Sequence, residues 1–174
     1  MADVDVHDRL SRLERMVVVL MAVVRVEADG PMPAESEAAA AVAAPAYLQG
    51  VRALQVDFDA TRSQRDFYRR LLGEVRRRMP AGMPLSMTAL ASWCESDRWM
   101  AGLPVAEAVP MLFRMGTNTG LTGAGDPLCR SSVGVSTDEP PASPSRGRRV
   151  YVFHPRAWSA EELRAAVYEV SRWQ

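Results

Sequence analysis

The chain has 174 residues, enough for one domain with a sizeable core. Its 21 basic residues, all arginine, balance 21 acidic residues, so the formal net charge is zero. A neutral chain with 7% aromatic residues lacks the basic surface that nucleic-acid binding requires, and with 48% apolar residues it is not disordered as a whole. We therefore expect a single domain over residues 1–174 and no nucleic-acid partner.

The metal-ligating residue types are scarce. The two cysteines, Cys94 and Cys129, and the two histidines, His7 and His154, show no zinc-binding spacing, so we expect no metal and no cofactor. The cysteines could form one disulfide, but their number does not decide the compartment. The longest apolar run, residues 16–24, has nine residues against the roughly 20 that a membrane span needs, so no membrane span is expected.

Apolar runs and helical stretches alternate through the first half of the chain. A helix is predicted over 8–16, and the β-branched run over 17–26 predicts a strand that is covered on both faces. In order, there follow an alanine-rich helix over 35–48 that Pro45 interrupts, a strand over 53–58, and a strongly amphipathic helix over 61–79 with Ser63 and Asp66 as its capping pair.

The second half continues the alternation. In order, strands are predicted over 85–91 and 108–115, a loop over 117–127, a strand over 132–136, a loop over 139–147, a strand over 149–153, and a helix over 159–173 capped by Ser159 and Glu162. Six strands separated by helices or long crossings indicate parallel β/α units. A closed (β/α)8 barrel needs eight strands and about 250 residues. The expected fold class is therefore α/β, either a partial (β/α)8 TIM-type barrel of about six units or a smaller open sheet.

Polar side chains gather where the predicted strands end, which is the edge where parallel α/β proteins bind ligands. Strand alternation places Gln55, Asp57 and Asp59 on one face and Val56 and Phe58 on the other. Two carboxylates so close together suit acid/base catalysis, sugar hydroxyl binding or a hard cation. The alternative interpretation is a pair of aspartates that cap the next turn or neutralise an arginine.

A second acidic pair, Asp138 and Glu139, follows the strand over 132–136. Either residue could supply a partner carboxylate to Asp59 across the mouth of a barrel. The alternative is a polar turn in front of Pro140 and Pro141.

Further candidate ligand-binding residues are Arg25, Glu27, Trp93, Arg114 and His154. An arginine at a strand end can hold a carboxylate with two hydrogen bonds, and the aromatic face of Trp93 would suit stacking on a sugar ring. Tryptophan is also a common core residue, and an isolated histidine before proline is more often structural.

Five segments carry a resemblance to a known family: LQVDFDATRSQRDFYRRLL, LSMTALASWC, DRWMAGLPVAEAVPMLFRMG, CRSSVGVSTDEP and RRVYVFHPRAW. Together they resemble the bacterial domain of unknown function family 3142, over about Val17 to Trp158. The resemblance implies a (β/α)8 barrel related in fold to glycoside hydrolases. It brings no established activity.

The resemblance also implies a departure at the start of the chain. Family members begin with two further β/α units, so the strand over 17–26 would correspond to their third strand. We therefore expect an N-terminally truncated barrel, from a late gene start or a decayed paralogue. Two missing strands would leave unpaired sheet edges, through which the chain could self-associate.

These patterns support three hypotheses. The first is a glycosidase-like enzyme with Asp57, Asp59 and Glu139 as catalytic residues. The second is a non-catalytic binder of a glycan or another small polar ligand, with Arg25, Glu27, Trp93, Arg114, Asp138 and His154 among the binding residues. The third is an inactive fragment. Carboxylates that are buried and neutralised by Arg25 or Arg114 would favour the second or third hypothesis.

Overall fold

A computed structural model of the chain describes residues 19–27, 30, 32–113, 125–139 and 147–171. Its centre is one six-stranded sheet with the strands in sequence order, β1-β2-β3-β4-β5-β6, and every neighbouring pair parallel. The strands are β1 (Leu20–Arg25), β2 (Val51–Asp57), β3 (Leu85–Leu90), β4 (Glu107–Met111), β5 (Ser132–Ser136) and β6 (Arg149–Phe153).

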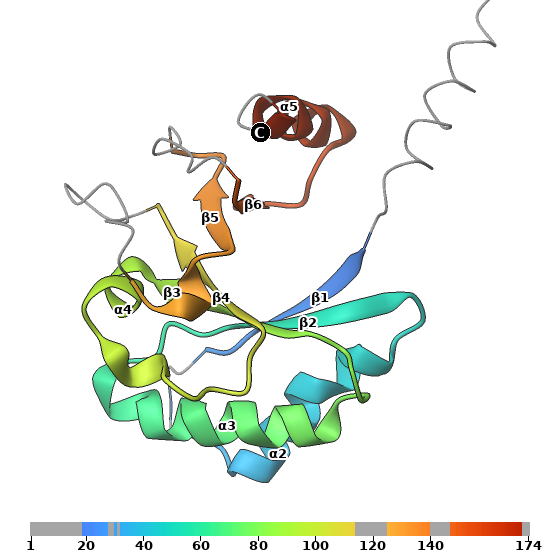
Figure 1. Ribbon diagram of the computed structural model, residues 1–174. Helices are drawn as coiled ribbons and strands as arrows, with labels where there is room; N and C mark the ends of the chain where they lie inside the picture. Colours follow the sequence, from blue (N-terminus) through green and yellow to red (C-terminus); the bar gives the residue numbers. More distant parts are fainter. Residues whose placement is uncertain (1–18, 28–29, 31, 114–124, 140–146, 172–174) are drawn as a thin grey trace, which may run out of the picture.

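Helices or short 3-10 turns lie between the strands from β1 to β5, and the sheet curls into a half-barrel (Figure 1). The α-helices are α2 (Glu35–Ala43), α3 (Arg65–Arg78), α4 (Ala91–Glu95) and α5 (Ala160–Ser171). Short 3-10 turns cover η1 (Ala44–Tyr47), η2 (Arg62–Gln64), η3 (Arg98–Met100) and η4 (Pro127–Cys129). In Figure 1, α2 and α3 lie on the opposite side of the sheet from α5. None of the described helices is long and apolar enough to cross a membrane.

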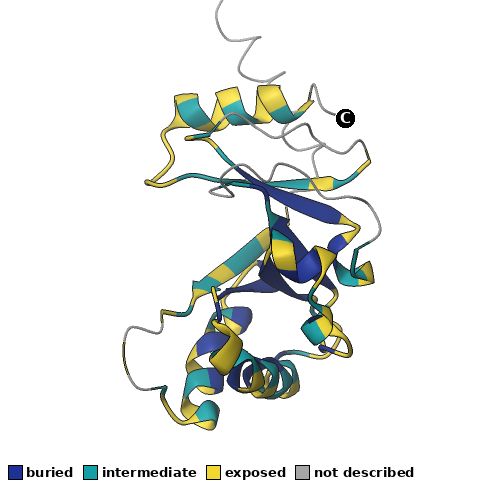
Figure 2. Ribbon diagram, turned by 90° about the vertical axis from the view of Figure 1, so that its left-hand side faces the viewer, coloured by how far each residue is buried: buried dark blue, intermediate teal, exposed yellow. Residues whose placement is uncertain are grey.

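The core lies between the sheet and the pair α2 and α3. Four side chains of α3 are fully buried, because their helical spacing places them on one face: Tyr68, Leu71, Leu72 and Val75. The ring of Tyr68 meets Phe58 edge to face with centroids 5.0 Å apart. Figure 2 shows that burial is concentrated here, whereas α5 has no buried residue.

The other face of the sheet, turned away from α2 and α3, is here named the inner face. On β2 and β3 it carries buried polar side chains that bond to one another. Gln55 Nε2 donates to Ser86 Oγ at 3.0 Å, and Thr88 Oγ1 donates to Asp57 Oδ1 at 2.8 Å. Because each polar group has a partner, the polar row is compatible with burial.

A second polar cluster lies on the inner face towards the amino ends of β4 to β6. The buried carboxylate of Glu107 accepts hydrogen bonds from Arg149 Nη1 at 3.0 and 3.2 Å, from Ser131 Oγ at 3.1 Å, and from the hydroxyl of Tyr151. These bonds reach from β4 across β5 to β6. They hold the curl of the sheet where β4 and β5 share only the register pair Met111 and Gly134.

Most predicted elements are confirmed, with one clear error of burial. Strands β5 and β6 have the predicted bounds, while β4 ends at Met111, before the predicted residue 115. Among the residues that the structure describes, strand β1 is not covered on both faces and lies at the edge of the sheet, and Val19, Leu20 and Val23 are 56%, 53% and 53% exposed. The predicted helix over 8–16, and most of the loops over 117–127 and 139–147, lie outside the described residues.

Two helix starts test the predicted caps. The predicted pair Ser63 and Asp66 is wrong: Thr61 and Gln64 form the capping box, with Thr61 N donating to Gln64 Oε1 at 2.8 Å. At α5 the prediction is confirmed. Ser159 N donates to Glu162 Oε2 at 2.9 Å, and Glu162 N donates to Ser159 Oγ at 3.2 Å.

A disulfide joins Cys94 and Cys129, 35 residues apart in sequence, with Cα atoms 5.9 Å apart. It links α4 to the η4 turn, and both cysteines are buried. Arginines of α3 support the same region from the other side. Arg65 pairs with Asp97 and lies over the ring of Trp99, 5.5 Å from its centroid. This part of the helix is therefore packed against neighbouring residues and is not a fully solvated surface.

Candidate functional site

The carboxyl ends of β1 and β2 hold a group of four charged residues, here named the strand-end cluster: Arg25, Glu27, Asp57 and Asp59. Arg25 is at its centre. Its Nη1 lies 2.8 Å from Asp57 Oδ2, its Nη2 3.5 Å from Asp59 Oδ2, and its Nε 3.6 Å from Glu27 Oε1. One cation thus faces three carboxylates, so the cluster has an excess of negative charge.

Strand register explains this grouping. Arg25 and Asp57 are direct partners in the parallel pairing of β1 with β2, and both lie on the inner face. Asp59 follows two residues later, just beyond the strand. The hydrogen bond to Asp57 is the largest cause that raises the pKa of Arg25, and the negative charge of Asp57 is the second. The guanidinium therefore stays charged.

Asp57 and Asp59 differ in what they can do. The Asp57 side chain is 10% exposed, and its two oxygens accept hydrogen bonds from Arg25 and Thr88. The Asp59 side chain is 51% exposed and touches Arg25 only at 3.5 Å. Asp57 is therefore fixed in orientation and neutralised by Arg25, whereas Asp59 can reach a ligand from solvent.

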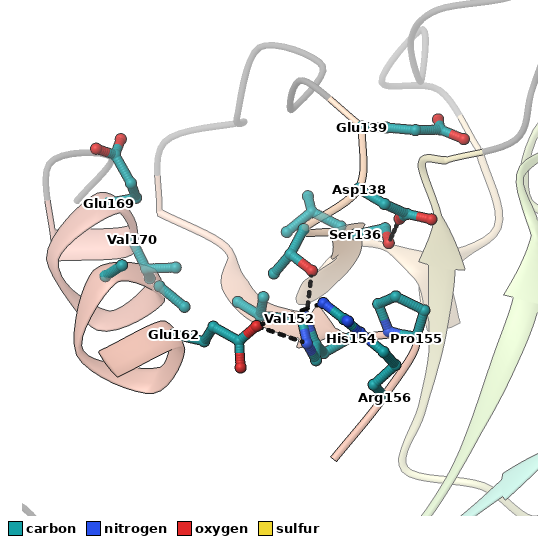
Figure 3. Close-up of a pocket in the computed structure, with 14 residues that line it drawn as sticks. Ser136, Asp138, Glu139, Val152, His154, Pro155, Arg156, Glu162, Glu169 and Val170 are labelled. Carbon is teal, nitrogen blue, oxygen red and sulfur yellow. Dashed lines mark hydrogen bonds and ion pairs between the residues drawn. The ribbon is translucent and has the colours of Figure 1, made fainter. Parts of the chain in front are cut away.

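The carboxyl ends of β5 and β6 border a cavity of about 600 Å³ under α5, here named the α5 pocket. Figure 3 shows Asp138, Glu139 and His154 in its wall. Val135, Val152, Ala166 and Val170 supply apolar surface, and Arg156, Glu162 and Glu169 supply charge. The Ser136 hydroxyl donates to the carboxylate of Asp138.

His154 is a well-enclosed polar residue of the α5 pocket, with a side chain that is 7% exposed. Its Nδ1 lies 2.6 Å from Thr137 Oγ1, and its Nε2 lies 3.5 Å from Glu162 Oε1 (Figure 3). The ring stacks on Trp158 with centroids 4.6 Å apart. Three elements therefore fix the imidazole: the end of β5, the segment after β6, and α5.

Apart from Trp93 and Arg114, the predicted site residues fall into these two groups. These residues lie at or just beyond the carboxyl ends of parallel strands, so Asp59 and Asp138 lie at the same end of the sheet. However, β3 and β4 separate the two groups, and neither Asp57 nor Asp59 lines the α5 pocket.

Two predicted ligand-binding residues stand apart. Trp93 is 3% exposed and packs edge to face on Trp99, with centroids 5.0 Å apart, so it is a core residue with little ring surface for stacking on a sugar. Arg114 lies outside the described residues.

Three contact residues escaped the sequence analysis. Thr88 fixes Asp57, Thr137 binds His154, and Glu162, seen only as a cap, also faces His154. For Thr88 a signal existed, since Ser86 and Thr88 alternate along a predicted strand. Within the described ranges, no group of three His, Cys, Asp or Glu residues could hold a metal ion.

A curled parallel sheet with connecting helices and polar strand ends defines an α/β half-barrel protein. The model of a family described as "Domain of unknown function (DUF3142)" matches residues 17–112, and the chain belongs to this family. The strand-end cluster lies within the matched residues, and the α5 pocket lies outside them. Comparisons with curated proteins and with solved structures gave no match.

Proposed function

We propose that this protein binds a carbohydrate, or another small polyhydroxylated ligand, at the strand-end cluster. Arg25 and Asp59 would contact the ligand, and Asp57 would position Arg25. The observation that carries the proposal is that Arg25 is held in place by Asp57 and is also exposed to solvent. Its guanidinium is anchored to the buried Asp57 at 2.8 Å, yet its side chain remains 53% exposed.

The chemistry of sugars suits such a pair. Each sugar hydroxyl can donate one hydrogen bond and accept others, so it can bridge the Asp59 carboxylate and the Arg25 guanidinium. Bonds to charged groups are about twice as strong as neutral ones. Because Asp57 and Thr88 already hold the cluster in place, binding would cost less side-chain entropy.

The fold gives weaker support, because it is an argument by analogy. Six parallel strands that curl with helices between them are consistent with part of a TIM-type barrel. Such barrels bind ligands at the carboxyl ends of their strands, and the strand-end cluster is at that edge. We include in this proposal a relation in fold to glycoside hydrolases, which rests on the same analogy.

Hydrolysis of a glycosidic bond is the second candidate. It is favoured by the exposure of Asp59 and by its position at the same end of the sheet as Asp138 and Glu139. A retaining enzyme needs two carboxyl groups about 5 Å apart, and an inverting enzyme about 6.5–9.5 Å. Asp57 is less suited to either role, because Arg25 and Thr88 already engage its oxygens.

Ligand-detected NMR against a panel of mono- and oligosaccharides tests the proposal. We expect the wild type to bind at least one member, and Asp59→Asn and Arg25→Ala each to weaken binding about tenfold, the effect of one lost hydrogen bond to a charged group. Glu37→Gln, an exposed carboxylate of α2, is the matched control and should bind as the wild type does.

The same panel separates the candidates. Release of reducing sugar by the wild type, lost in Asp59→Asn, would establish hydrolysis instead of binding alone. Absence of binding across the panel, or equal binding by Asp59→Asn, would overturn the proposal.

A further inference from the structure

The α5 pocket is chemically distinct from the strand-end cluster. Its walls under α5 are small and apolar: Val135, Val152, Ala165, Ala166 and Val170. Polar and charged residues also line the cavity, and three of them, Thr137, His154 and Glu162, meet at what is here named the polar end. A cavity of about 600 Å³ that combines apolar walls with such a polar group suits a small molecule that has an apolar part next to a reactive polar group.

The polar end has the connectivity of a hydroxyl, a base and an orienting carboxylate. Thr137 Oγ1 lies 2.6 Å from His154 Nδ1, and Glu162 Oε1 lies 3.5 Å from His154 Nε2. Thr137 is exposed, whereas His154 Nε2 is buried and has no hydrogen-bond partner at this separation. Thr137 is therefore a residue that a substrate can reach, while the far side of the base is closed to solvent.

The charge of Glu162 selects the tautomer of His154. Hydrogen bonds from the side chain and the backbone of Ser159 lower the pKa of Glu162, so the group facing Nε2 is a carboxylate. An unprotonated Nε2 would put a lone pair against this negative charge, so Nε2 carries the hydrogen. Nδ1 is then the acceptor and takes the hydrogen bond that the Thr137 hydroxyl donates.

We propose that Thr137 is a nucleophile that His154 activates and Glu162 orients, and that the α5 pocket hydrolyses esters of small carboxylic acids. The arrangement follows the logic of other hydroxyl–imidazole–carboxylate sites, in which roles and not chain positions define the chemistry. The apolar walls would hold an acyl group, and the ester carbonyl would lie at Thr137.

The reaction balances without a cofactor. Thr137 Oγ forms a bond to the carbonyl carbon while His154 Nδ1 takes the hydroxyl proton. The carbon–oxygen bond to the alcohol breaks, and the alcohol leaves with that proton. A water then attacks the acylated Thr137 and gives one proton to His154, which returns it to Thr137 Oγ as the carboxylic acid leaves.

Arg156 is placed to stabilise the charge that develops on the carbonyl oxygen. It is the arginine of the pocket lining, its side chain is 77% exposed, and its Nη2 lies 3.7 Å from Glu162 Oε1. A guanidinium this exposed and this loosely paired could turn from Glu162 towards a new anion. It is a stabilising residue and not the proton carrier.

Hydrolysis of p-nitrophenyl acetate and p-nitrophenyl butyrate by the full chain tests the proposal. We expect Thr137→Ala and His154→Gln to lower kcat/KM at least about 100-fold, since general-base assistance contributes about 10²–10⁴-fold. Thr137→Ser should retain activity, because it keeps the hydroxyl. Ser96→Ala is the matched control: it removes an exposed hydroxyl that bonds to Ser92 O outside the α5 pocket, and it should hydrolyse both esters as the wild type does.

A second measurement keeps the result independent of folding. Mass spectrometry of protein quenched during turnover should find the acyl group on the peptide that contains Thr137, and melting curves should show that each variant is folded. Hydrolysis no faster than in buffer, or equally fast in folded Thr137→Ala, would overturn the proposal. Neither outcome concerns sugar binding by Arg25 and Asp59, so the two proposals fail separately.

Discussion

Arg25 and Asp57 form an ion pair at 2.8 Å that joins the edge strand β1 to β2 at their carboxyl ends. One partner is half exposed and the other almost completely enclosed. The pair therefore belongs both to the packing of the sheet and to the surface that a ligand would meet.

This pairing predicts different results for the two aspartates. Asp57→Asn should lower the free energy of unfolding by about 1–3 kcal/mol, because it weakens hydrogen bonds to a charged group that is largely enclosed. Asp59→Asn should change it by no more than about 0.5 kcal/mol, since its contact with Arg25 is long and exposed. Urea titrations of both variants measure these differences. Equal losses would show that Asp59 is also structural.

Tyr68 predicts a loss of stability in alkali. The pKa of Tyr68 is raised well above its usual 10.0. Burial is the largest cause, and the negative charges of Asp57 and Asp59 add to it. In the unfolded chain the hydroxyl ionises near pH 10, while in the folded protein it keeps its proton. The folded state then binds more protons, so this stability is complete below about pH 10 and is lost as pH rises further.

Denaturant unfolding between about pH 8 and 11 measures this effect. The free energy of unfolding of Tyr68→Phe should fall less steeply with pH than that of the wild type. Tyr151→Phe is the comparison, because burial and a hydrogen bond to Glu107 also raise the pKa of Tyr151, which lies on β6. Identical slopes for Tyr68→Phe and the wild type would contradict the prediction.

The disulfide between Cys94 and Cys129 predicts a redox-dependent melting temperature. It closes a loop over 35 residues of sequence, and such cross-links stabilise by about 2–4 kcal/mol. Reduction, or the double change Cys94→Ser and Cys129→Ser, should therefore lower the melting temperature, and reductant should have no further effect on the double variant. An unchanged melting temperature in reductant would indicate that the surrounding core holds α4 and η4 without the bond.

The sequence predicts those structural features that depend on residues close together in the chain. It does not predict those that depend on contacts between distant segments. Strands β5 and β6 were predicted with correct bounds, because short apolar runs between turn residues are a local signal. The capping box of Ser159 and Glu162 is equally local. The burial of β1 was mispredicted, because an apolar run does not show what packs against each face of a strand.

The candidate site shows the same limit. Alternation correctly placed Asp57 on a polar face, but its bond to Thr88 spans 31 residues and depends on how the strands pair. The contact of Thr137 with His154 spans 17 residues, and Glu162 joins them only because α5 folds back over the end of β6. Periodicity carries no information on such contacts.

The edge of the sheet at β1 leads to the last prediction. Among the described residues, β1 pairs with β2 alone, and the apolar residues Val19, Leu20 and Val23 are exposed, while its one charged residue, Arg25, lies at its carboxyl end. An unpaired edge with exposed apolar residues is a template for pairing with another chain. We therefore expect this 174-residue chain to self-associate through β1.

Sedimentation velocity over a range of concentrations should show the wild type forming larger species, and Val23→Lys should shift it towards monomer because a charge on the edge opposes pairing. Leu163→Lys, at an equally exposed apolar position on α5, is the control and should associate as the wild type does. A wild type that stays monomeric and melts cooperatively would show that the edge needs no partner strand.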